Sequence, residues 1–362
     1  MERYPVGLVP GPVRVPEAAA ARYGEDYGSP DLEGDFLSLY RSCEAGLARL
    51  LHTENPVAIQ CGEGMLALWG ALNSVLAPGD RLLAVSSGVF GSGFAEMGRA
   101  LGLEVRLLEF PFSRLPDPEE VRQEALRFRP RMMTVVHCET PSGTLTPLED
   151  YGCIAREAEA LLCVDFVASA GGAPVRVDDW GIDLGLLGSQ KCLSLPPDLC
   201  FTSLSPRARE AVRLRGYQGY DALAPFEEAR LTGAFPYTHH WRGLAALRQA
   251  LDLYEEEGQE AVWSRHARAA ARCRSRLVDL GVALFPEEEA FCSPTVTAAR
   301  VPEGWTWEAL DGALRRRGVV LGGNYGPLAG KVFRFGHMGT QASLPLVDRA
   351  LDALGEVLAK RP

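Results

Sequence analysis

The sequence contains no long hydrophobic run and no excess of basic residues. No apolar stretch reaches the roughly 18 residues needed to cross a bilayer, and the opening MERYPVGLVPGP lacks the roughly 7 to 15 apolar residues of a secretory signal. We therefore expect a cytoplasmic protein with no membrane partner. The 37 Lys and Arg against 47 Asp and Glu leave a net charge of −10, which argues against nucleic acid as a partner.

Patterns that hold metals or disulfides are missing as well. The nine cysteines are odd in number and scattered, none forms a CxxC pair, and most lie in apolar segments, which predicts reduced thiols. The six histidines show no HExxH pattern, and His239 and His240 are adjacent rather than one helical turn apart. We expect no metal.

The residues that are present alternate between apolar runs and helical patterns. With 362 residues, 47% of them hydrophobic, the chain can bury a large core. The alternation predicts an α/β fold with a mostly parallel sheet covered by helices, in which ligands bind at the carboxyl ends of the strands. The predicted strands are 81–85, 105–110, 132–137, 161–165, 184–187 and 199–203, and the helices between them are 65–76, 92–101, 118–128 and 151–160.

The chain divides into three predicted parts. Four prolines within the first 16 residues exclude a regular helix or a central strand there, so residues 1–18 are expected to form an extended arm. Residues 19–258 carry the strand and helix alternation of a large domain, which ends with a helical pattern over 242–257. Residues 259–362 begin and end with helical patterns, at 259–280 and 346–359, and are expected to form a smaller C-terminal α/β domain.

A lysine stands where a predicted buried strand ends. Lys191, in GSQK, follows the apolar run 184–187. Burying an ammonium is costly unless the group is paired, neutralised or used chemically, and covalent catalysis through a Schiff base is such a use. Asp165 ends the preceding predicted strand. The pair suits pyridoxal phosphate, whose aldehyde needs an amine and whose ring nitrogen needs a carboxylate.

The chain resembles the class V aminotransferases, which are fold type I pyridoxal phosphate enzymes, and within them the alanine:glyoxylate and serine:pyruvate branch. The resemblance runs nearly from end to end and is most specific in LLCVDFVASAGGAPVRVDDWGIDLGLLGSQKCL (161–193). The other stretches that carry it are LVPGPVRVP, GEGMLALWGALNSVLAPGD, HCETPSGTLTPLED, FPYTHHWRGLAALRQAL and GKVFRFGHMGT. The resemblance implies a homodimer.

The resemblance also assigns the residues around the cofactor ring. Lys191 would bond to the cofactor and then carry a proton between the substrate Cα and the cofactor carbon. Asp165 would pair with the ring nitrogen. Phe90 would stack on one face of the ring and Val167 on the other, with Thr140 beside the phenolic oxygen.

The cofactor phosphate is expected at the turn Gly62-Glu63-Gly64-Met65, where backbone N–H groups and the helix dipole would bind it. Relatives carry a small hydroxyl residue where Glu63 stands, and a carboxylate repels phosphate. We therefore expect Glu63 to point outward or toward a partner subunit. Further contacts are implied for Gln190 and for the pair Tyr237 and Thr238, with Thr238 reaching across from the other subunit of a homodimer.

The substrates implied by the resemblance are a small amino acid and a small 2-oxo acid. Alanine or serine would donate the amine to the cofactor, and glyoxylate or pyruvate would then accept it in a ping-pong mechanism. Arg334, in VFRFGHMG, would bind the substrate carboxylate. Gly11, in the arm, would close over the substrate. The loop YGSPDLEGDF (27–36) departs from the histidine-containing loop of relatives and leaves the side-chain pocket undefined.

Other interpretations remain open. Phe90 also suits an ordinary core aromatic, Arg334 a surface ion pair and Thr238 a helix cap. A cysteine desulfurase shares this fold but needs a mobile cysteine, for which Cys292 is the candidate. A 2-aminoethylphosphonate transaminase would need more cations than a single arginine, and a non-catalytic regulatory domain would not need both Lys191 and Asp165.

Overall fold

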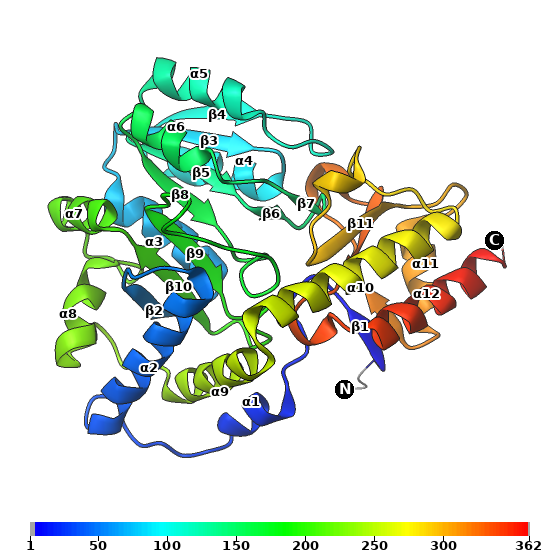
Figure 1. The fold of residues 1–362 in the computed structure, drawn as a ribbon, viewed down its shortest axis with the longest axis horizontal. Coiled ribbons are helices and arrows are strands. Elements are labelled where there is room, and N and C mark those ends of the chain that lie inside the picture. Colours follow the sequence, from blue (N-terminus) through cyan, green and yellow to red (C-terminus); the bar gives the residue numbers. More distant parts are fainter. Residues whose placement is uncertain (1–3, 361–362) are drawn as a thin grey trace.

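A seven-stranded sheet forms the centre of the large domain in the computed structural model, which describes residues 4–360 (Figure 1). The strand order is β2-β10-β9-β8-β5-β3-β4. β10 is antiparallel to both of its neighbours, and the other pairs are parallel. The strands are β2 (Val57–Cys61), β3 (Arg81–Ser86), β4 (Glu104–Glu109), β5 (Met132–Val136), β8 (Leu161–Asp165), β9 (Leu184–Gly188) and β10 (Leu199–Leu204).

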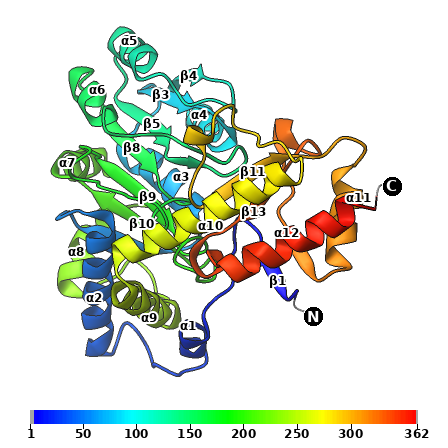
Figure 2. The same ribbon diagram turned by 45° about the vertical axis from the view of Figure 1, so that its right-hand side comes forward.

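Helices cover both faces of this sheet. Because crossovers between parallel strands are right-handed, the connections β2 to β3 and β3 to β4 place α3 and α4 on one face. The connections β4 to β5 and β5 to β8 run the other way along the sheet and place α5 and α6 on the opposite face (Figure 2). The bounds are α3 (Gly64–Val75), α4 (Val89–Ala100), α5 (Pro118–Phe128) and α6 (Tyr151–Glu157).

The predicted α/β architecture with a mostly parallel sheet is confirmed. Every strand and helix predicted in the large domain is present, and the ends differ by three residues at most. The predictions miss α2 (Gly34–Leu51), β2 and several short elements of the large domain. The run of β2, VAIQC, is short and contains Gln60, so only its pairing with β10 makes it a buried strand.

The smaller C-terminal part contains a second, shorter sheet. β11 (Val296–Arg300) pairs antiparallel with β13 (Val332–Gly336), and β1 (Val6–Leu8) pairs parallel with β12 (Val319–Leu321). An isolated bridge between Gly322 and Arg334 connects the two pairs. The helices here are α10 (Gln259–Asp279), α11 (Trp307–Arg315) and α12 (Leu344–Leu358). The predicted arm thus supplies a strand to this sheet; residues 1–3 of the arm and 361–362 of the predicted small domain lie outside the described residues.

One long helix connects the two parts of the chain. α9 (Trp241–Glu257) packs against α1 (Glu17–Arg22) and α2 of the large domain, and α10, which follows it, runs from there to the small sheet (Figure 2). The remaining elements are α7 (Pro206–Arg215), α8 (Ala224–Thr232), the hairpin β6 (Cys138–Glu139) and β7 (Thr144–Leu145), and the 3-10 helices η1 (Glu289–Phe291), η2 (Gly326–Leu328) and η3 (Gly339–Gln341).

Four clusters of buried apolar side chains are present, and three of them hold the layers together. The largest surrounds the seven-stranded sheet and includes Phe94, Phe166 and Phe201. The second lies between the small sheet and its helices and includes Phe333 and Phe335. A third joins the arm to both sheets at the edge where the strands of the large sheet end, and its members are Val13, Cys138, Ala168, Cys192, Val296 and Met338.

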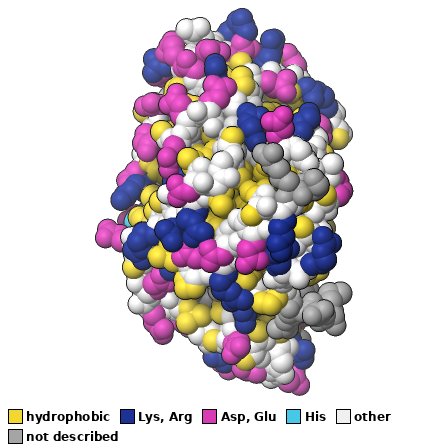
Figure 3. All heavy atoms as spheres, turned by 90° about the vertical axis from the view of Figure 1, so that its right-hand side faces the viewer, with side chains coloured by type: hydrophobic (Ala, Val, Ile, Leu, Met, Phe, Trp, Pro, Cys, Tyr) yellow, Lys and Arg dark blue, Asp and Glu magenta, His cyan; other side chains and the backbone are white. Residues whose placement is uncertain are grey.

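The surface around the small sheet carries charges of both signs. On the face in Figure 3, basic and acidic side chains are interspersed and patches of apolar side chains lie between them. Among the helices of residues 4–360, none is both long enough and apolar enough to cross a membrane.

The arm is held by a close backbone contact that permits only glycine at Gly336. A Cβ on Gly336 would lie 2.2 Å from the carbonyl oxygen of Val9, so Gly336→Ala must displace the arm. We expect it to lower the free energy of unfolding by about 3 kcal/mol, measured by urea denaturation. Gly312→Ala in α11 is the matched control, because the nearest atom is the end of the Arg316 side chain at 3.6 Å; it should be neutral or stabilising by up to about 1 kcal/mol. Equal effects of the two substitutions would contradict the close contact.

Candidate active site

The carboxyl ends of β2, β3, β5, β8 and β9 open onto one edge of the large sheet. These strands run in the same direction, so the loops that follow them lie together there. A cavity of about 110 Å³ is found among these loops. Its lining residues are Glu63, Gly64, Met65, Leu68, Phe90, Cys138, Thr140, Asp165, Val167, Ala168, Gln190 and Lys191. Nine of these are residues predicted from the sequence to hold the cofactor.

Lys191 follows β9, and the arm encloses its amine. Its Nζ donates a hydrogen bond to the carbonyl of Pro10. The backbone of Gly11 passes so close that a Cβ there would lie 2.7 Å from Nζ. Burial, followed by the nearby charge of Arg334, lowers the pKa of Lys191. A lysine with a lowered pKa is more readily neutral, which is the form that attacks an aldehyde.

Asp165 ends β8 at the bottom of the same cavity and is 5% exposed. Its Oδ1 accepts a hydrogen bond of 2.7 Å from the backbone N–H of Val167. Burial raises the pKa of Asp165 to about 6, while this hydrogen bond and the charge of Lys191 partly offset the rise. A protonated ring nitrogen in the cavity would supply the positive charge that this carboxylate needs.

The three residues predicted to surround the ring line the cavity as well. Phe90 lies in the first turn of α4, Thr140 follows β6, and Val167 follows β8. Val167 packs against the start of α3, where a Cβ on Gly64 would lie 2.9 Å from its Cγ2. The cavity therefore has an aromatic, an aliphatic and a hydroxyl group around the position predicted for a flat ring.

Glu139 binds the backbone at Phe90 and was not among the predicted residues. Its side chain is 1% exposed and accepts hydrogen bonds from the backbone N–H groups of Gly91 at 2.6 Å and of Phe90 at 3.2 Å. These N–H groups belong to the first turn of α4, which favours a negative charge. Burial nevertheless raises the pKa of Glu139 to about 7. A charged residue shortly after the apolar strand β5, in HCETPSG, was the available signal.

Glu63 does not point outward or toward a partner, and that expectation is wrong. It is the N-cap of α3, where its Oε1 accepts from the backbone N–H of Met65 at 3.1 Å. Its Oε2 accepts from Nε2 of Gln190 at 2.9 Å. The helix N-terminus draws the carboxylate inward. Gly62, the residue before it, has φ of +152°, and the turn thus places Glu63 in the cavity wall.

Tyr237 and Thr238 lie outside this cavity within the single chain. The hydroxyl of Tyr237 accepts a hydrogen bond of 3.0 Å from the backbone N–H of Cys61, at the end of β2. The hydroxyl of Thr238 donates to Asp31 at 3.1 Å, in the loop that precedes α2. The role of Thr238 in the site of a second subunit stays a prediction.

Arg334 lies near Lys191, although it comes from β13 of the small sheet. It is 7% exposed, and its Nε and Nη2 donate to the carbonyl of Gly323 at 2.8 and 2.6 Å. The ring of Tyr325, which was not predicted, lies 5.1 Å from the guanidinium carbon and contacts Phe90 edge-on. Arg334 is therefore buried rather than part of a surface ion pair, and an aromatic ring orients it.

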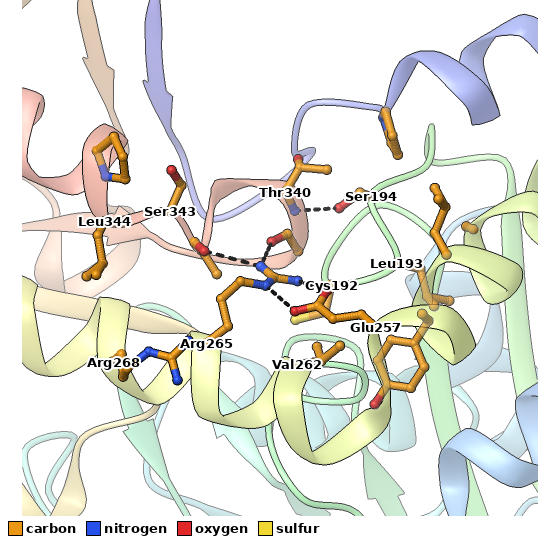
Figure 4. Close-up of a pocket in the computed structure, with 17 residues that line it drawn as sticks. Cys192, Leu193, Ser194, Glu257, Val262, Arg265, Arg268, Thr340, Ser343 and Leu344 are labelled. Atoms are coloured by element: carbon orange, nitrogen blue, oxygen red, sulfur yellow. Dashed lines mark hydrogen bonds and ion pairs between the residues drawn. The ribbon is translucent and has the colours of Figure 1, made fainter.

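A larger cavity of about 630 Å³ lies elsewhere, between α9, α10 and the segment 339–345 (Figure 4). Arg265 crosses it and is already engaged by Glu257 and by the carbonyls of Gly339 and Ala342. Because Arg265 and Glu257 are paired with each other, and because Lys191 and Asp165 do not line this cavity, we place the chemistry in the smaller cavity.

The structure bears on two further kinds of site, a metal centre and a mobile catalytic cysteine. Within residues 4–360, no group of three or more His, Cys, Asp or Glu side chains could hold a metal ion. Cys292 directly follows η1 and forms an isolated β-bridge with Thr144, so backbone pairing holds the cysteine that a desulfurase would need on a mobile loop.

Comparison with known proteins finds the same family over nearly the whole chain. The family described as "Aminotransferase class-V" matches residues 12–326. The chain is 33% identical to an alanine–glyoxylate aminotransferase of Callithrix jacchus, covering 98% of this chain and 88% of that protein. It is 34% identical to a pyridoxamine–pyruvate transaminase of Mesorhizobium japonicum, covering 90% and 84%. The solved alanine–glyoxylate aminotransferase of Nostoc sp. is 31% identical, with a TM-score of 0.95 over 99% and 96% of the chains.

The raised pKa of Glu139 predicts a pH-dependent stability. Its carboxyl titrates near 4.5 when unfolded and near 7 when folded, so the folded protein binds more protons between these values. The contribution of Glu139 is therefore fully present below pH 4.5 and is lost as the pH rises to 7 and above. The free energy of unfolding of the wild type minus that of Glu139→Gln should fall by on the order of 3 kcal/mol across this window. Groups common to both proteins cancel in the difference, and a difference that does not vary with pH would contradict the assignment.

Proposed function

The chain belongs to the class V aminotransferases, which depend on pyridoxal 5′-phosphate, and from this premise we propose that it moves the amine of alanine or serine to glyoxylate or pyruvate. The observation that carries the proposal is the convergence of Lys191 and Asp165 in one cavity, with Arg334 close by. We also propose a cytoplasmic homodimer in which Thr238 contributes to the site of the other subunit.

The residues present fit the ring and the aldehyde of the cofactor. Asp165 is a buried carboxylate that lacks a cationic partner of its own, and it would hold a protonated ring nitrogen. Phe90 and Val167 would pack on the ring, and Lys191 offers the amine. At the predicted phosphate site, in contrast, the carboxylate of Glu63 does not fit a phosphate dianion.

Two properties of Lys191 suit it to move protons. When bound, the cofactor supplies an aldehyde that takes up the amine and a ring that withdraws electrons from the substrate Cα. Burial lowers the pKa of Lys191, so its Nζ can accept the proton from that Cα and return one to the carbon beside the ring. Nζ lies against the carbonyl of Pro10 and the backbone of Gly11, so the arm shields the amine from water.

Arg334 provides the charge that recognises a substrate carboxylate. Gly323 orients the guanidinium through Nε and Nη2, and the ring of Tyr325 covers it. A planar guanidinium suits a carboxylate, and its burial strengthens the contact. An aminophosphonate carries more negative charge than a carboxylate and would need further cations, so the single Arg334 favours an amino acid.

Pyridoxamine is a second candidate donor of the amine. The Mesorhizobium relative is named for it, and the position of Glu63 in the cavity wall favours a ring without phosphate. In such a reaction the CH2–NH2 group of pyridoxamine becomes an aldehyde while the carbonyl of pyruvate becomes CH–NH2. The exchange is balanced and needs no further oxidant or reductant.

Replacing Lys191 tests the proposal directly. Lys191→Ala should abolish the visible absorption of a lysine-bound pyridoxal ring and lower transamination by about 10³-fold or more, because no other amine can take its place. The chain has only two further lysines, Lys331 and Lys360. Lys331→Ala is the matched control, since this exposed side chain donates only to the carbonyl of Pro327, and it should keep both signals. An absorption band that survives in Lys191→Ala would contradict the proposal.

Replacing Arg334 tests which substrates the site accepts. Arg334→Lys keeps the charge but loses the planar fork, so kcat/KM for alanine should fall by about 10- to 100-fold, mostly through KM. Arg300→Lys is the matched control, because this arginine also lies 5.1 Å from an aromatic ring, that of Phe285, but outside the site. Steady-state kinetics with alanine, serine, glycine, cysteine and 2-aminoethylphosphonate measure the effect.

The same screen separates the competing functions. Release of sulfide from cysteine as the only reaction would identify a desulfurase and contradict transamination. A preference for 2-aminoethylphosphonate would contradict Arg334 as the single anchor of a carboxylate. Binding of the cofactor without turnover of any donor would indicate a regulatory domain.

A further inference from the structure

A carboxylate occupies the part of the cavity where this family is expected to bind phosphate. Glu63, Gly64, Met65 and Gln190, which we call the α3 wall, form one side of the cavity that also contains Lys191. A helix N-terminus such as that of α3 is an anion site. Here the carboxylate of Glu63 occupies that anion site.

Glu63 engages two of the donors of the α3 wall that would otherwise be available to a phosphate. Its Oε1 accepts the backbone N–H of Met65 at 3.1 Å, and its Oε2 accepts from Nε2 of Gln190 at 2.9 Å. A phosphate at the α3 wall would have to displace these contacts and lie beside the carboxylate. Like charges at such a distance repel each other, and the repulsion is stronger where water is excluded.

No other cation of the cavity offsets this repulsion. Among the residues that line the cavity in the described part of the chain, Lys191 is the one with a basic side chain, and Asp165 adds a second carboxylate. The amine of Lys191 is directed to the arm, where it donates to Pro10. A phosphate monoester, with a charge of about −1.5 to −2 near neutral pH, would therefore enter a cavity whose wall is already acidic.

The α3 wall does offer acceptors for a hydroxyl group. Because Nε2 of Gln190 faces Glu63, its Oε1 is the free end of the amide, and this atom is buried without a hydrogen-bond partner within residues 4–360. Gln190 itself is 6% exposed. A buried acceptor without a donor is costly. The 5′-hydroxymethyl group of pyridoxal or pyridoxamine carries an O–H that can donate to Gln190 or Glu63, whereas a phosphate dianion has no proton to donate.

We propose that the α3 wall selects the unphosphorylated vitamers, pyridoxal and pyridoxamine, over their 5′-phosphates, and that Glu63 is the residue that determines this preference. The inference rests on the proposed function, because the same Lys191 and Asp165 act on the ring. Without the phosphate as an anchor, the ring exchanges with solvent and acts as a substrate of the transamination, in the balanced reaction given for pyridoxamine above.

Equilibrium binding tests the preference without relying on turnover. The purified protein, freed of bound vitamer by dialysis against pyruvate or alanine, is titrated with pyridoxal and, separately, with pyridoxal 5′-phosphate, and the absorption change gives each Kd. We expect the wild type to bind pyridoxal at least about tenfold more tightly than the phosphate form. Glu63→Ser and Glu63→Gln should each shift the ratio of the two Kd values toward the phosphate by tenfold or more.

A control and two variants keep the result interpretable. Glu119→Gln removes the same charge from the first turn of α5, outside the cavity, and should leave the ratio unchanged. Glu63→Gln can still cap α3 through its side-chain oxygen, so one of the two Glu63 variants is expected to fold, which circular dichroism checks. A wild type that binds pyridoxal 5′-phosphate as tightly as pyridoxal, or better, would overturn the inference. A ratio unchanged in a folded Glu63 variant would overturn the role of Glu63.

Failure of the inference can be told apart from failure of the proposed function. With either vitamer at saturation, the proposed function requires an absorption change that depends on Lys191 and an amine transfer from alanine to glyoxylate, which yields pyruvate and glycine. If both are seen but the phosphate form binds better, only the selectivity is wrong. If no Lys191-dependent absorption appears with either vitamer, the proposed function is wrong.

Discussion

The burial of one lysine amine constrains the whole site. Taking an ammonium out of water is costly, and the surroundings of Lys191 favour the neutral amine, because Nζ meets the carbonyl of Pro10 while Arg334 adds a second positive charge nearby. The arm can approach this closely only because Gly11 has no side chain. Pairing of β1 with β12 holds the arm in place. The amine of Lys191 follows a strand of the large sheet, and the arm that encloses it is anchored in the small sheet.

Three buried or half-buried carboxylates around this amine have different partners and therefore different roles. Asp165 receives a single backbone N–H and lacks a full counter-charge, which suits it to a cationic ring nitrogen. Glu139 receives two N–H groups from the start of α4 and thereby fixes Phe90. Glu63 binds the N–H of Met65 and the amide of Gln190, and so closes a helix N-terminus to other anions. A carboxylate can thus pair with a cation, position a neighbouring residue or exclude other anions, depending on which hydrogen-bond donors surround it.

Much of the fold and part of the site could be predicted because they depend on local patterns. Apolar runs of strand length predicted β8 and β9, and polar residues at their ends predicted Asp165 and Lys191. β2 could not be predicted in this way, since its burial comes from pairing with β10, a strand about 140 residues later in the chain. Glu139 was missed because its partners, the N–H groups of Phe90 and Gly91, lie 49 and 48 residues away.

The sequence by itself determined the fold class, the family and which lysine and aspartate are predicted to act on the ring, since these depend on residue types and on the order of strands along the chain. The tertiary structure alone decided the direction of side chains. Whether Glu63 faces solvent or the cavity depends on the turn at Gly62 and on Gln190, which is 127 residues away. That Arg334 lies near Lys191 follows from the packing of the small sheet on the large one. Charge interactions and hydrogen bonds depend on the distance between atoms in space. For residues far apart in the sequence, that distance is set only when the chain is folded.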